Sequence, residues 1–360
     1  MLGIKKALVN GRKTLCFAGL RIPYRTKQSG LNKWFCIGKI KIPYHISSVL
    51  HIPLPWRESL RNIKNSPLQK QKSEHYRVRT MWEDSQKVQQ RLEEIYAQRL
   101  GKRPDLNDPH TLTEKLNWLK LHCRDPLMTE CCDKYAVKEY IARSLGGSYH
   151  VPTLGAWTAA KDIDFSCLPD SFVLKVNWSS GYNIFIENKT RISEREKKRI
   201  LALIDYWMQP MCNSYYDSFN WAYRDIAPVV YAEEYLDKSG VAREFKVFCF
   251  HGKPEFVLIE QNAGDEAGSR VCVDTEGRRL PFHFGMQLET RNYDLPQDYA
   301  QMLDSAKILS RPFPFVRVDF LGTEQRRMIG EMTFYSGGGF SVVTPDGWDE
   351  KLGDLLQIGK

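Results

Sequence analysis

The sequence predicts an α+β fold of two or three subdomains, preceded by a basic extension of β-strand repeats. Residues 172–186 and 315–334 each have the pattern strand, turn, strand, and apolar residues recur at helical spacing between positions 85 and 145. A repeat of 20 residues near the amino terminus predicts the extension. Because 360 residues exceed what one compact core usually holds, more than one subdomain is expected.

The composition is that of an ordinary soluble protein. Hydrophobic residues make up 42% and charged residues 26% of the chain, and no apolar run approaches the ~20 residues of a membrane span. The first residues lack the apolar stretch of a signal peptide. Nine cysteines without a CxxC pair are typical of reduced thiols, and the histidines lack metal-ligand spacing. We therefore expect a cytoplasmic protein without a zinc site.

Positive charge is concentrated near the amino terminus. Residues 1–80 contain 17 lysines and arginines against two acidic residues, a net charge of +15, whereas the rest of the chain carries −6. Such basic modules bind anionic surfaces or polymers, so nucleic acid, anionic lipid and acidic polysaccharide are all possible partners. No RNA-binding or helix-turn-helix motif accompanies the charge, which ranks nucleic acid last.

The same region contains the repeat, in which residues 15–25 resemble residues 35–45 and, more weakly, 51–57. Each copy predicts a short strand that ends at proline, and the stacked strands would form a small ribbon. Such a ribbon suits an acidic chain or a lipid headgroup layer, although a solvated cap is an equal alternative. The basic residues expected near one side of the ribbon are Arg21, Arg25, Lys39 and Lys41.

Three helices are expected before position 150. Apolar spacing predicts one helix from about Ser85 to Leu100, and capping residues followed by spaced leucines predict a docking helix within residues 108–120. A third helix should open at Cys132 and end at Gly146, with Lys134 in its first turn. Because a helix amino terminus favours phosphate, Lys134 is a candidate nucleotide contact, with a merely solvated lysine as the alternative.

Residues 172–186 predict a strand, a loop of small residues and a second strand. Lys175 lies inside an apolar strand, where an unpaired lysine would cost several kcal/mol, so it should face an anion. Ser179, Ser180 and Gly181 can turn backbone N–H groups and hydroxyls onto phosphate oxygens, with glycine permitting close approach. The alternative is a hairpin whose lysine reaches solvent.

Residues 229–236 predict a strand that runs into a connection between subdomains, and a further strand begins at Glu244. Backbone amides of the connection could pair with an adenine edge. Glu244 could hold ribose hydroxyls, and Lys246 on the same strand face could reach phosphates. An exposed, charged strand edge is the alternative.

Residues 315–334 predict a hairpin that carries acidic groups. Alternation places Arg317 and Asp319 on one face of the first strand, and the returning strand should bring Glu331 near Asp319. Two such carboxylates repel each other unless cations lie between them, and oxygen ligands suit Mg²⁺, which often binds substrate phosphates as well. The pattern indicates a magnesium nucleotide, with a solvated surface hairpin as the alternative.

A resemblance to the TupA-like branch of the ATP-grasp superfamily is carried by seven segments in order: DKYAVKEY, FVLKVNWSSG, AEEYL, EFKVFCFHGKP, PFVRVDF, GEMTF and LGDLL. It covers about residues 106–355 and implies two α+β subdomains that clamp ATP between antiparallel sheets. The domains expected are 1–80 (basic repeat region), 81–150 (helical part), 151–236 (first ATP-grasp subdomain) and 237–360 (second subdomain with the magnesium site).

The resemblance also implies roles position by position. Phosphate contacts are implied for Lys134, Lys175, Ser179, Ser180 and Gly181. The adenine-binding linker is implied at Glu233, Glu234, Tyr235 and Leu236, and the ribose-binding acid at Glu244. Magnesium ligands are implied at Asp319 and Glu331. Thr333 stands where an asparagine commonly adds a metal contact, and it can bind only through its hydroxyl. The candidate catalytic residues are Arg317, Lys175 and Lys246.

The implied chemistry uses ATP and Mg²⁺ to activate a carboxylate. The carboxylate would attack the γ-phosphate to give an acylphosphate and ADP, and an amine would then form an amide. Because the family's usual setting is cell-surface polysaccharide assembly, we expect an amino acid or other amine to join a uronic-acid carboxyl of a glycan or its precursor. The basic region would hold an acidic or lipid-linked glycan, with possible peripheral contact at the inner face of the cytoplasmic membrane.

Two alternatives keep the fold and change the function. In the first, a glycan hydroxyl receives the phosphoryl group, as in a kinase, and no amide forms. In the second, the protein is a non-catalytic glycan-binding or assembly protein.

Overall fold

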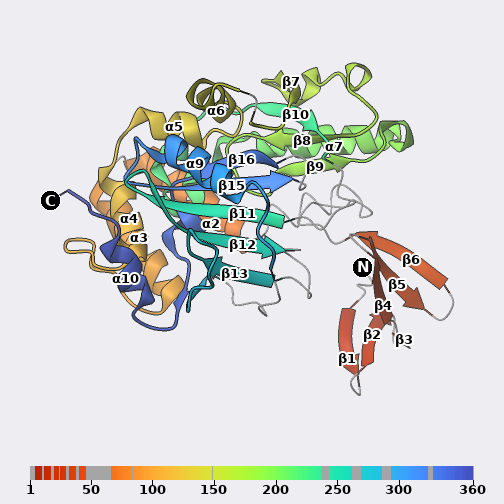
Figure 1. Ribbon diagram of the computed structural model, residues 1–360. Coiled ribbons are helices and arrows are strands. Elements are labelled where there is room, and N and C mark those ends of the chain that lie inside the picture. Colours follow the sequence, from red (N-terminus) through yellow and green to blue (C-terminus); the bar gives the residue numbers. More distant parts are fainter. Residues whose placement is uncertain are drawn as a thin grey trace. The chain divides into compact units, whose positions relative to one another are not determined.

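The computed structural model divides into two compact units, Met1–Ser59 and Leu60–Lys360 (Figure 1). Within the first unit it describes the backbone of six strands, and within the second unit it describes most of the chain. The described residues are 5–9, 12–17, 20–23, 25–29, 32–37, 40–45, 66–82, 85–147, 149–236, 243–261, 269–285, 293–322 and 327–359. The finer subdomain boundaries expected from the sequence stay predictions.

The first unit contains two three-stranded antiparallel sheets. The strands are β1 (Lys5–Val9), β2 (Arg12–Phe17) and β3 (Leu20–Pro23) in one sheet, and β4 (Arg25–Ser29), β5 (Asn32–Ile37) and β6 (Ile40–His45) in the other. Equivalent strands of the two sheets lie about 20 residues apart in the chain, so the period of the sequence repeat is also the period of the sheets. The expected β-strand character of this region is confirmed.

The prediction of one strand per repeat copy in a single ribbon was wrong. Each copy spans two paired strands, β2 with β3 in the first copy and β5 with β6 in the second, because a strand needs a neighbour that pairs with its backbone N–H and C=O groups. The basic positions are distributed over both sheets, with Arg21 in β3 and Arg25 in β4. Lys41 lies in β6, whereas Lys39 and the echo at 51–57 lie outside the described residues.

The second unit begins with helices. They are α2 (Pro67–Trp82), α3 (Ser85–Leu100), α4 (Leu112–His122), α5 (Pro126–Cys132) and α6 (Val137–Leu145). The helix predicted from Ser85 to Leu100 is confirmed as α3. The docking helix is confirmed as α4, whose start is fixed by a capping box between Thr111 and Glu114. The polar sequence of α2 gave no periodic signal, and this helix was not predicted.

The helix expected to open at Cys132 is instead divided in two. Cys132 ends α5, and α6 begins only at Val137. Between them, the Asp133 carboxylate accepts hydrogen bonds from the backbone N–H groups of residues 135 and 136 at 2.8 and 3.1 Å, which turns the chain. Lys134 therefore lies in this turn and not in the first turn of a helix. The predicted end at Gly146, in the left-handed conformation, is confirmed.

A four-stranded antiparallel sheet follows, in the order β7-β10-β8-β9. Its strands are β7 (Thr153–Trp157), β8 (Phe172–Val176), β9 (Asn183–Ile186) and β10 (Val230–Glu234), and the connection from β9 to β10 contains α7 (Glu194–Trp207) and α8 (Tyr215–Ser218). The strands expected within 172–186 and 229–236 are confirmed. The segment Trp178–Tyr182 links β8 to β9.

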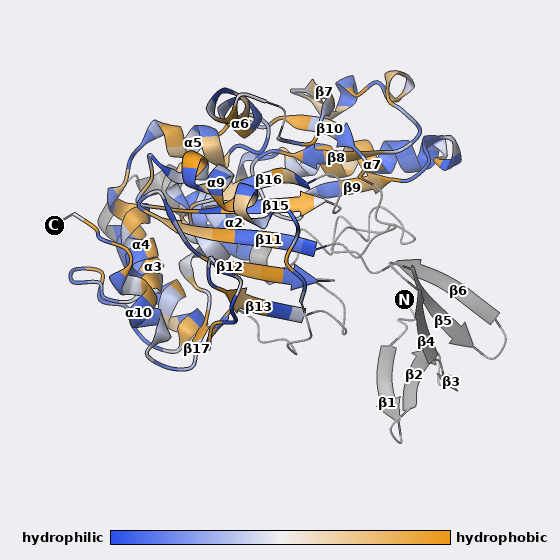
Figure 2. Ribbon diagram, in the orientation of Figure 1, coloured by the Kyte–Doolittle hydropathy of each residue, from blue (hydrophilic) through white to orange (hydrophobic). Residues whose placement is uncertain are grey.

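The second sheet of this unit has five antiparallel strands in the order β13-β12-β11-β15-β16 (Figure 1). They are β11 (Arg243–Phe250), β12 (Lys253–Gln261), β13 (Ser269–Val273), β15 (Phe315–Gly322) and β16 (Arg327–Thr333). Helix α9 (Tyr299–Ser310) packs on β11, β12 and β15, and apolar residues at alternate positions of these strands are buried. Figure 2 shows hydrophobic residues of these strands in orange and hydrophilic ones in blue. The opposite face carries the charged residues.

Smaller elements complete the described chain. A two-stranded ribbon joins β14 (His283–Phe284) to β17 (Val343–Thr344), and α10 (Trp348–Asp354) packs on α4. Short 3₁₀ segments are η1 (Ala160–Asp162), η2 (Phe165–Cys167), η3 (Lys189–Arg191), η4 (Pro210–Cys212), η5 (Trp221–Tyr223) and η6 (Ser336–Gly339). Among the described helices, none is long and apolar enough to span a membrane.

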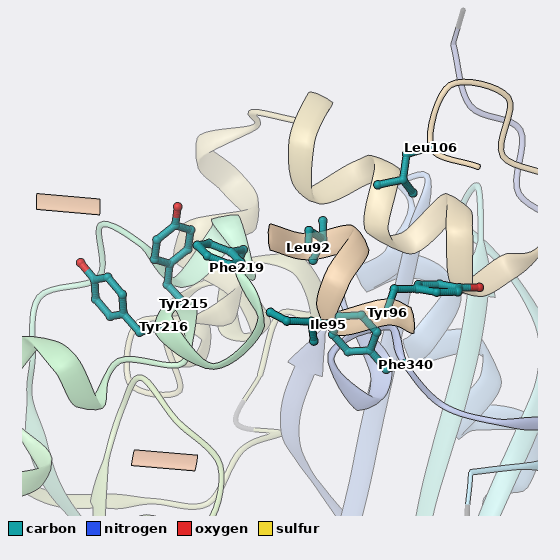
Figure 3. Close-up of a cluster of buried hydrophobic side chains, with 8 residues drawn as sticks. All are labelled: Leu92, Ile95, Tyr96, Leu106, Tyr215, Tyr216, Phe219 and Phe340. Atoms are coloured by element: carbon teal, nitrogen blue, oxygen red, sulfur yellow. The ribbon is translucent and has the colours of Figure 1, made fainter. Parts of the chain in front are cut away.

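One aromatic cluster connects the helical part to the rest of the second unit (Figure 3). Its buried members come from α3, from the segment between α3 and α4, from the α8 region and from the segment after η6. They are Leu92, Ile95, Tyr96, Leu106, Tyr215, Tyr216, Phe219 and Phe340. Burial of each large side chain contributes on the order of 2 kcal/mol, so this cluster fixes η6 against the helices.

Candidate functional site

The hairpin of β15 and β16 brings the predicted acidic pair together. Asp319 lies directly opposite Glu331 in the strand register, and Arg317 lies opposite Thr333. The Arg317 guanidinium donates to both Asp319 carboxylate oxygens at 2.6 and 2.5 Å and to Oε1 of Glu331 at 3.1 Å. The Thr333 hydroxyl donates to the same Glu331 oxygen at 3.0 Å. The predicted pairing of Asp319 with Glu331 is thus confirmed, and an arginine holds the two acids together.

The electrostatic environments of these two acids differ. Burial raises the pKa of the Asp319 carboxyl to about 6, although the adjacent Arg317 opposes the shift. Burial would also raise the pKa of Glu331, but Lys134 and Arg317 together hold it well below its usual range. Both carboxylates are therefore predominantly ionised at neutral pH and are balanced by fixed cations.

Lys134 reaches this hairpin from the turn between α5 and α6, and its ammonium pairs with Oε2 of Glu331. Buried Asn177 fixes that turn. Its carbonyl oxygen accepts from the Lys134 backbone N–H at 3.1 Å, and its side-chain amide donates to Asp133 at 2.8 Å. Its side-chain oxygen also accepts from the Val229 N–H at 2.9 Å, so Asn177 connects the lysine turn to the four-stranded sheet. Sequence reasoning missed this residue because its partners are distant in the chain.

A second ionic cluster lies on the four-stranded sheet. Buried Glu233 pairs with Lys175 at 2.5 Å through one oxygen and with Lys138 at 2.6 Å through the other. Burial would raise the pKa of Glu233, but the two lysines lower it below its usual value. Lys175 does face an anion, as its place in an apolar strand required, and the anion in this structure is Glu233. Lys138 lies in α6, four residues after Lys134. It was missed because the sequence around a single lysine in a helix does not distinguish a buried lysine from a solvated one.

The two clusters approach each other at Tyr231. This buried tyrosine lies opposite Lys175 in the strand register, and its pKa is raised by burial together with the charges of Glu233, Asp133 and Glu331. Its ring contacts that of Tyr135 with the centroids 5.6 Å apart. Tyr231 therefore lies within electrostatic range of both ionic clusters.

Lys246 extends the site along the five-stranded sheet. It lies opposite Asp319 in the register, and its ammonium pairs with Glu260 and, at 3.2 Å, with the exposed Glu244. Burial would lower the pKa of Lys246, but Asp319 and Glu260 raise it above its usual value. Glu260 is only 2% exposed and also pairs with Arg270 at 2.5 Å. Glu260 was missed because its role depends on two neighbouring strands.

The predicted small-residue loop has an exposed tip. Ser179 is buried, whereas Ser180 and Gly181 are exposed, and Gly181 has a φ of 78°. That left-handed conformation favours glycine, and the missing side chain leaves the backbone open to a ligand. A polyphosphate could approach the backbone at this tip.

The four residues predicted as the adenine linker lie at the end of β10 and directly after it. Glu233 points to the two lysines, β10 ends at Glu234, and the Glu234 N–H donates to the Pro152 carbonyl at 3.1 Å. Tyr235 contacts the ring of Phe185, and Leu236 is half-buried. The structure does not bring these residues into the ionic clusters, except for Glu233.

The glycine-rich segment η6 contacts Arg317. Arg317 Nη1 donates at 2.9 Å to the Ser336 hydroxyl, at the start of η6. The buried Lys120 ammonium donates to the Gly338 and Ser218 carbonyls at 2.5 and 2.9 Å, and Asn117 donates to the Gly339 carbonyl at 2.8 Å. Lys120 belongs to the helix predicted only to dock, and nothing in its spacing distinguished it from solvated lysines.

The oxygen donors of the hairpin fit magnesium. Across the residues that the structure describes, no group of three or more His, Cys, Asp or Glu side chains could hold a metal by itself. Mg²⁺ is commonly bound by one or two carboxylates together with waters and substrate phosphates. Asp319 and Glu331, with the hydroxyl of Thr333 beside them, provide this kind of donor set.

This chain is similar to a known protein family and to several solved structures. A family model described as TupA-like ATPgrasp matches residues 114–357. No curated protein matches the chain. Similar solved structures include D-alanine–D-alanine ligase from Bacillus anthracis complexed with ATP, at 14% identity and a TM-score of 0.34 over 57% of this chain and 55% of that one. The chain thus matches little more than half the length of that ligase.

Another similar structure is the ATP-grasp ligase PsnB complexed with minimal precursor, Mg and ADP. It is 11% identical, with a TM-score of 0.35, over 68% of this chain and 65% of that one. N5-carboxyaminoimidazole synthetase from Staphylococcus aureus complexed with ADP is 14% identical, with a TM-score of 0.32, over 56% of this chain and 43% of that one.

Proposed function

Because the chain belongs to the TupA-like ATP-grasp family, we propose that it is an ATP-dependent ligase that joins a carboxylate to an amine. The family match confirms the resemblance found in the sequence motifs and the predicted ATP-grasp fold. One observation carries the functional proposal: Asp319 and Glu331 lie opposite each other on one hairpin, and Arg317 contacts both.

ATP and Mg²⁺ are the proposed cosubstrate and cofactor. Asp319 and Glu331, with Thr333 beside them, would hold the metal. When bound, Mg²⁺ would neutralise charge on the phosphate oxygens of the nucleotide. The exposed tip of Ser180 and Gly181 would contact the phosphates through backbone N–H groups.

Three lysines are proposed to donate to phosphate oxygens, and each already pairs with a carboxylate that is buried or half-buried. The pairs are Lys134 with Glu331, Lys175 with Glu233, and Lys246 with Glu260. A paired lysine stays charged although it is partly withdrawn from water. Its carboxylate partner also restricts its direction, so the cations are positioned before a nucleotide arrives.

The proposed reaction needs no nucleophile from the protein. A substrate carboxylate oxygen attacks the γ-phosphorus of ATP, and the bond from that phosphorus to the bridging β–γ oxygen breaks. ADP leaves, and the substrate is now an acylphosphate. An amine then attacks the acyl carbon, phosphate leaves, and the amine loses a proton to solvent or phosphate. Arg317 would stabilise the negative oxygen that forms on the acyl carbon during this second step.

We further propose that the carboxylate belongs to a uronic acid of a cell-surface polysaccharide or its precursor, and that the amine is an amino acid or similar compound. The net charge of +15 within residues 1–80 supports an acidic acceptor. A lipid-linked acceptor at an anionic membrane surface would suit the same charge.

The experiment is to measure ADP release across pairs of uronates and amines and to determine the product mass. An amide product formed with ADP and phosphate supports the proposal. A sugar phosphate formed with ADP would instead support a kinase. If the protein binds no magnesium nucleotide, a non-catalytic glycan-binding role is favoured. The Asp319→Asn variant is the background control, since it removes a proposed metal ligand with little change in shape.

A further inference from the structure

We propose that helix α2 positions the loop Trp178–Tyr182 through Gln69 and Lys72. This inference rests on the proposed role of that loop in phosphate binding, and it goes beyond that role, because α2 lies outside the residues 114–357 matched by the family model. Both residues would be positioning residues, since they act on the nucleotide through the loop.

The buried side chains that the structure describes in α2 are polar. Gln69, Lys72 and His75 follow one another at intervals of three residues, and they are 5%, 3% and 0% exposed. Residues at this spacing lie on one side of a helix. Polar side chains are seldom buried unless they make hydrogen bonds, so a helix that buries three of them has specific partners.

Some of these partners fix α2 to the segment around α8. Lys72 Nζ donates to the Cys212 carbonyl at 3.3 Å, and Nδ1 of His75 lies 2.9 Å from the Tyr216 carbonyl oxygen. The His75 ring also contacts that of Phe219, with the centroids 4.5 Å apart. These contacts give α2 a defined place against the body of the second unit.

The same face of α2 also reaches the loop. Gln69 Nε2 donates to the Tyr182 hydroxyl at 3.3 Å, and the Lys72 ammonium lies 5.6 Å from the centre of the Tyr182 ring. The Tyr182 carbonyl accepts a hydrogen bond from the Val176 N–H at 3.0 Å, which closes the loop at the end of β8. Tyr182, the last residue of the loop, therefore connects α2 to the segment that carries Ser180 and Gly181.

Trp207 of α7 holds both ends of the loop. Its ring stacks on that of Tyr182, with the centroids 4.9 Å apart and the planes 3° from parallel. Its carbonyl accepts from Trp178 Nε1 at 3.0 Å. With its ends fastened, the loop exposes only Ser180 and Gly181, the two residues that a phosphate would approach.

These contacts should keep the loop ordered before a ligand binds. A loop that is fixed before binding loses less conformational entropy when its ligand binds, and this increases affinity. Removal of the Gln69 contact should leave α2 folded, because its other contacts remain, and should loosen the loop at Tyr182. A neutral hydrogen bond of this kind changes an equilibrium by about threefold to tenfold.

The test compares Gln69→Leu with Gln71→Leu. Gln71 is a matched control on the same helix, because its side chain donates to the Asp217 carbonyl at 3.4 Å and makes no described contact with the loop. Two quantities are measured for each variant: the affinity for Mg·AMP-PNP by calorimetry, and the exchange rates of the amide hydrogens of residues 179–182 without ligand.

We expect Gln69→Leu to weaken Mg·AMP-PNP binding and to accelerate loop exchange by about threefold to tenfold, with Gln71→Leu close to wild type. Tyr182→Phe should have a similar effect, and the Gln69→Leu/Tyr182→Phe double variant should be little worse than either single variant. Equal loop exchange in Gln69→Leu and Gln71→Leu would overturn the inference. If the wild type binds no Mg·AMP-PNP, the proposed function fails, and the exchange comparison still decides the role of Gln69.

Discussion

Asp319 and Glu331 occupy opposed positions of one antiparallel strand pair, and a single nitrogen of Arg317 lies 2.5 Å from the first carboxylate and 3.1 Å from the second. Two neighbouring carboxylates would repel each other strongly in a buried setting. The shared guanidinium offsets that repulsion, so both acids can remain ionised on the surface where a magnesium nucleotide is proposed to bind.

The acidic pair gives the first prediction. Asp319→Asn and Glu331→Gln should each reduce Mg²⁺-dependent turnover on the order of a hundredfold or more, because each removes a proposed anionic metal ligand without a change in size. Calorimetry should show that Mg²⁺ no longer increases the affinity of either variant for ADP. The exposed Asp346→Asn serves as the control. Full ADP formation in either site variant would refute the assignment.

Lys175 gives the second prediction. Lys175→Met should weaken ATP binding by about tenfold or more, since hydrogen bonds from a charged donor are stronger than neutral ones. The fold should be preserved, because Glu233 keeps its pair with Lys138 at 2.6 Å. Lys161→Met, at an exposed position, should bind as the wild type does. If calorimetry gives the same ATP affinity for Lys175→Met and the wild type, Lys175 does not contact the nucleotide.

His75 gives a prediction for stability against pH. Burial lowers its pKa from 6.5 to about 4, and among the described residues its Nε2 has no hydrogen-bond partner. The unfolded chain therefore binds a proton more readily than the folded chain between these values. The free energy of unfolding should fall as the pH falls through this window, by on the order of 2–3 kcal/mol from this group.

The measurement is urea unfolding at pH 7 and pH 4.5. The His75→Asn side chain keeps a donor for the Tyr216 carbonyl but has no titrating ring. The free energy of unfolding of this variant should therefore decrease less between pH 7 and pH 4.5 than that of the wild type. His110→Asn, at an exposed position, should follow the wild type. The same loss in His75→Asn and wild type would mean that the buried imidazole does not titrate in this window.

The basic region gives a prediction from charge alone. Neutralising Arg21, Arg25, Lys39 and Lys41 together should raise the KM for a polymeric uronate and leave kcat with a small uronate unchanged, because contacts remote from the reacting carboxyl bind ground and transition states alike. The effect should shrink as salt rises, since the Debye length is about 8 Å at physiological ionic strength. An identical KM for the polymer at low salt would leave the region without a role in acceptor binding.

The parts of the site that the sequence predicted depend on short-range patterns. Strand alternation places Arg317 beside Asp319, and the closeness of the two strands in the sequence favours the return of Glu331 opposite Asp319, so this hairpin was predictable. Lys175 was also identifiable, because a lysine in an apolar strand requires an anion. Its partner Glu233 was assigned to the linker, since only the pairing of β10 with β8 brings the two together.

The missed features depend on long-range packing. Glu260 pairs with Lys246 and Arg270 only because β12 lies between their two strands. Helix α2 has no apolar stripe, and its polar face can be recognised only from the carbonyls and the tyrosine that it contacts. Lys134 was placed in a helix because the sequence does not reveal that the Asp133 side chain would turn the chain.

Transfer of ¹⁸O from a labelled uronate to phosphate tests most directly whether the site activates a carboxylate. A uronate labelled with ¹⁸O in its carboxyl group is incubated with ATP, Mg²⁺ and an amine, and the released phosphate is analysed by mass. An acylphosphate route predicts phosphate that contains one ¹⁸O atom from the uronate, together with ADP and an amide. Formation of ADP with unlabelled phosphate, or with the phosphoryl group retained on a sugar hydroxyl, would contradict the proposed reaction.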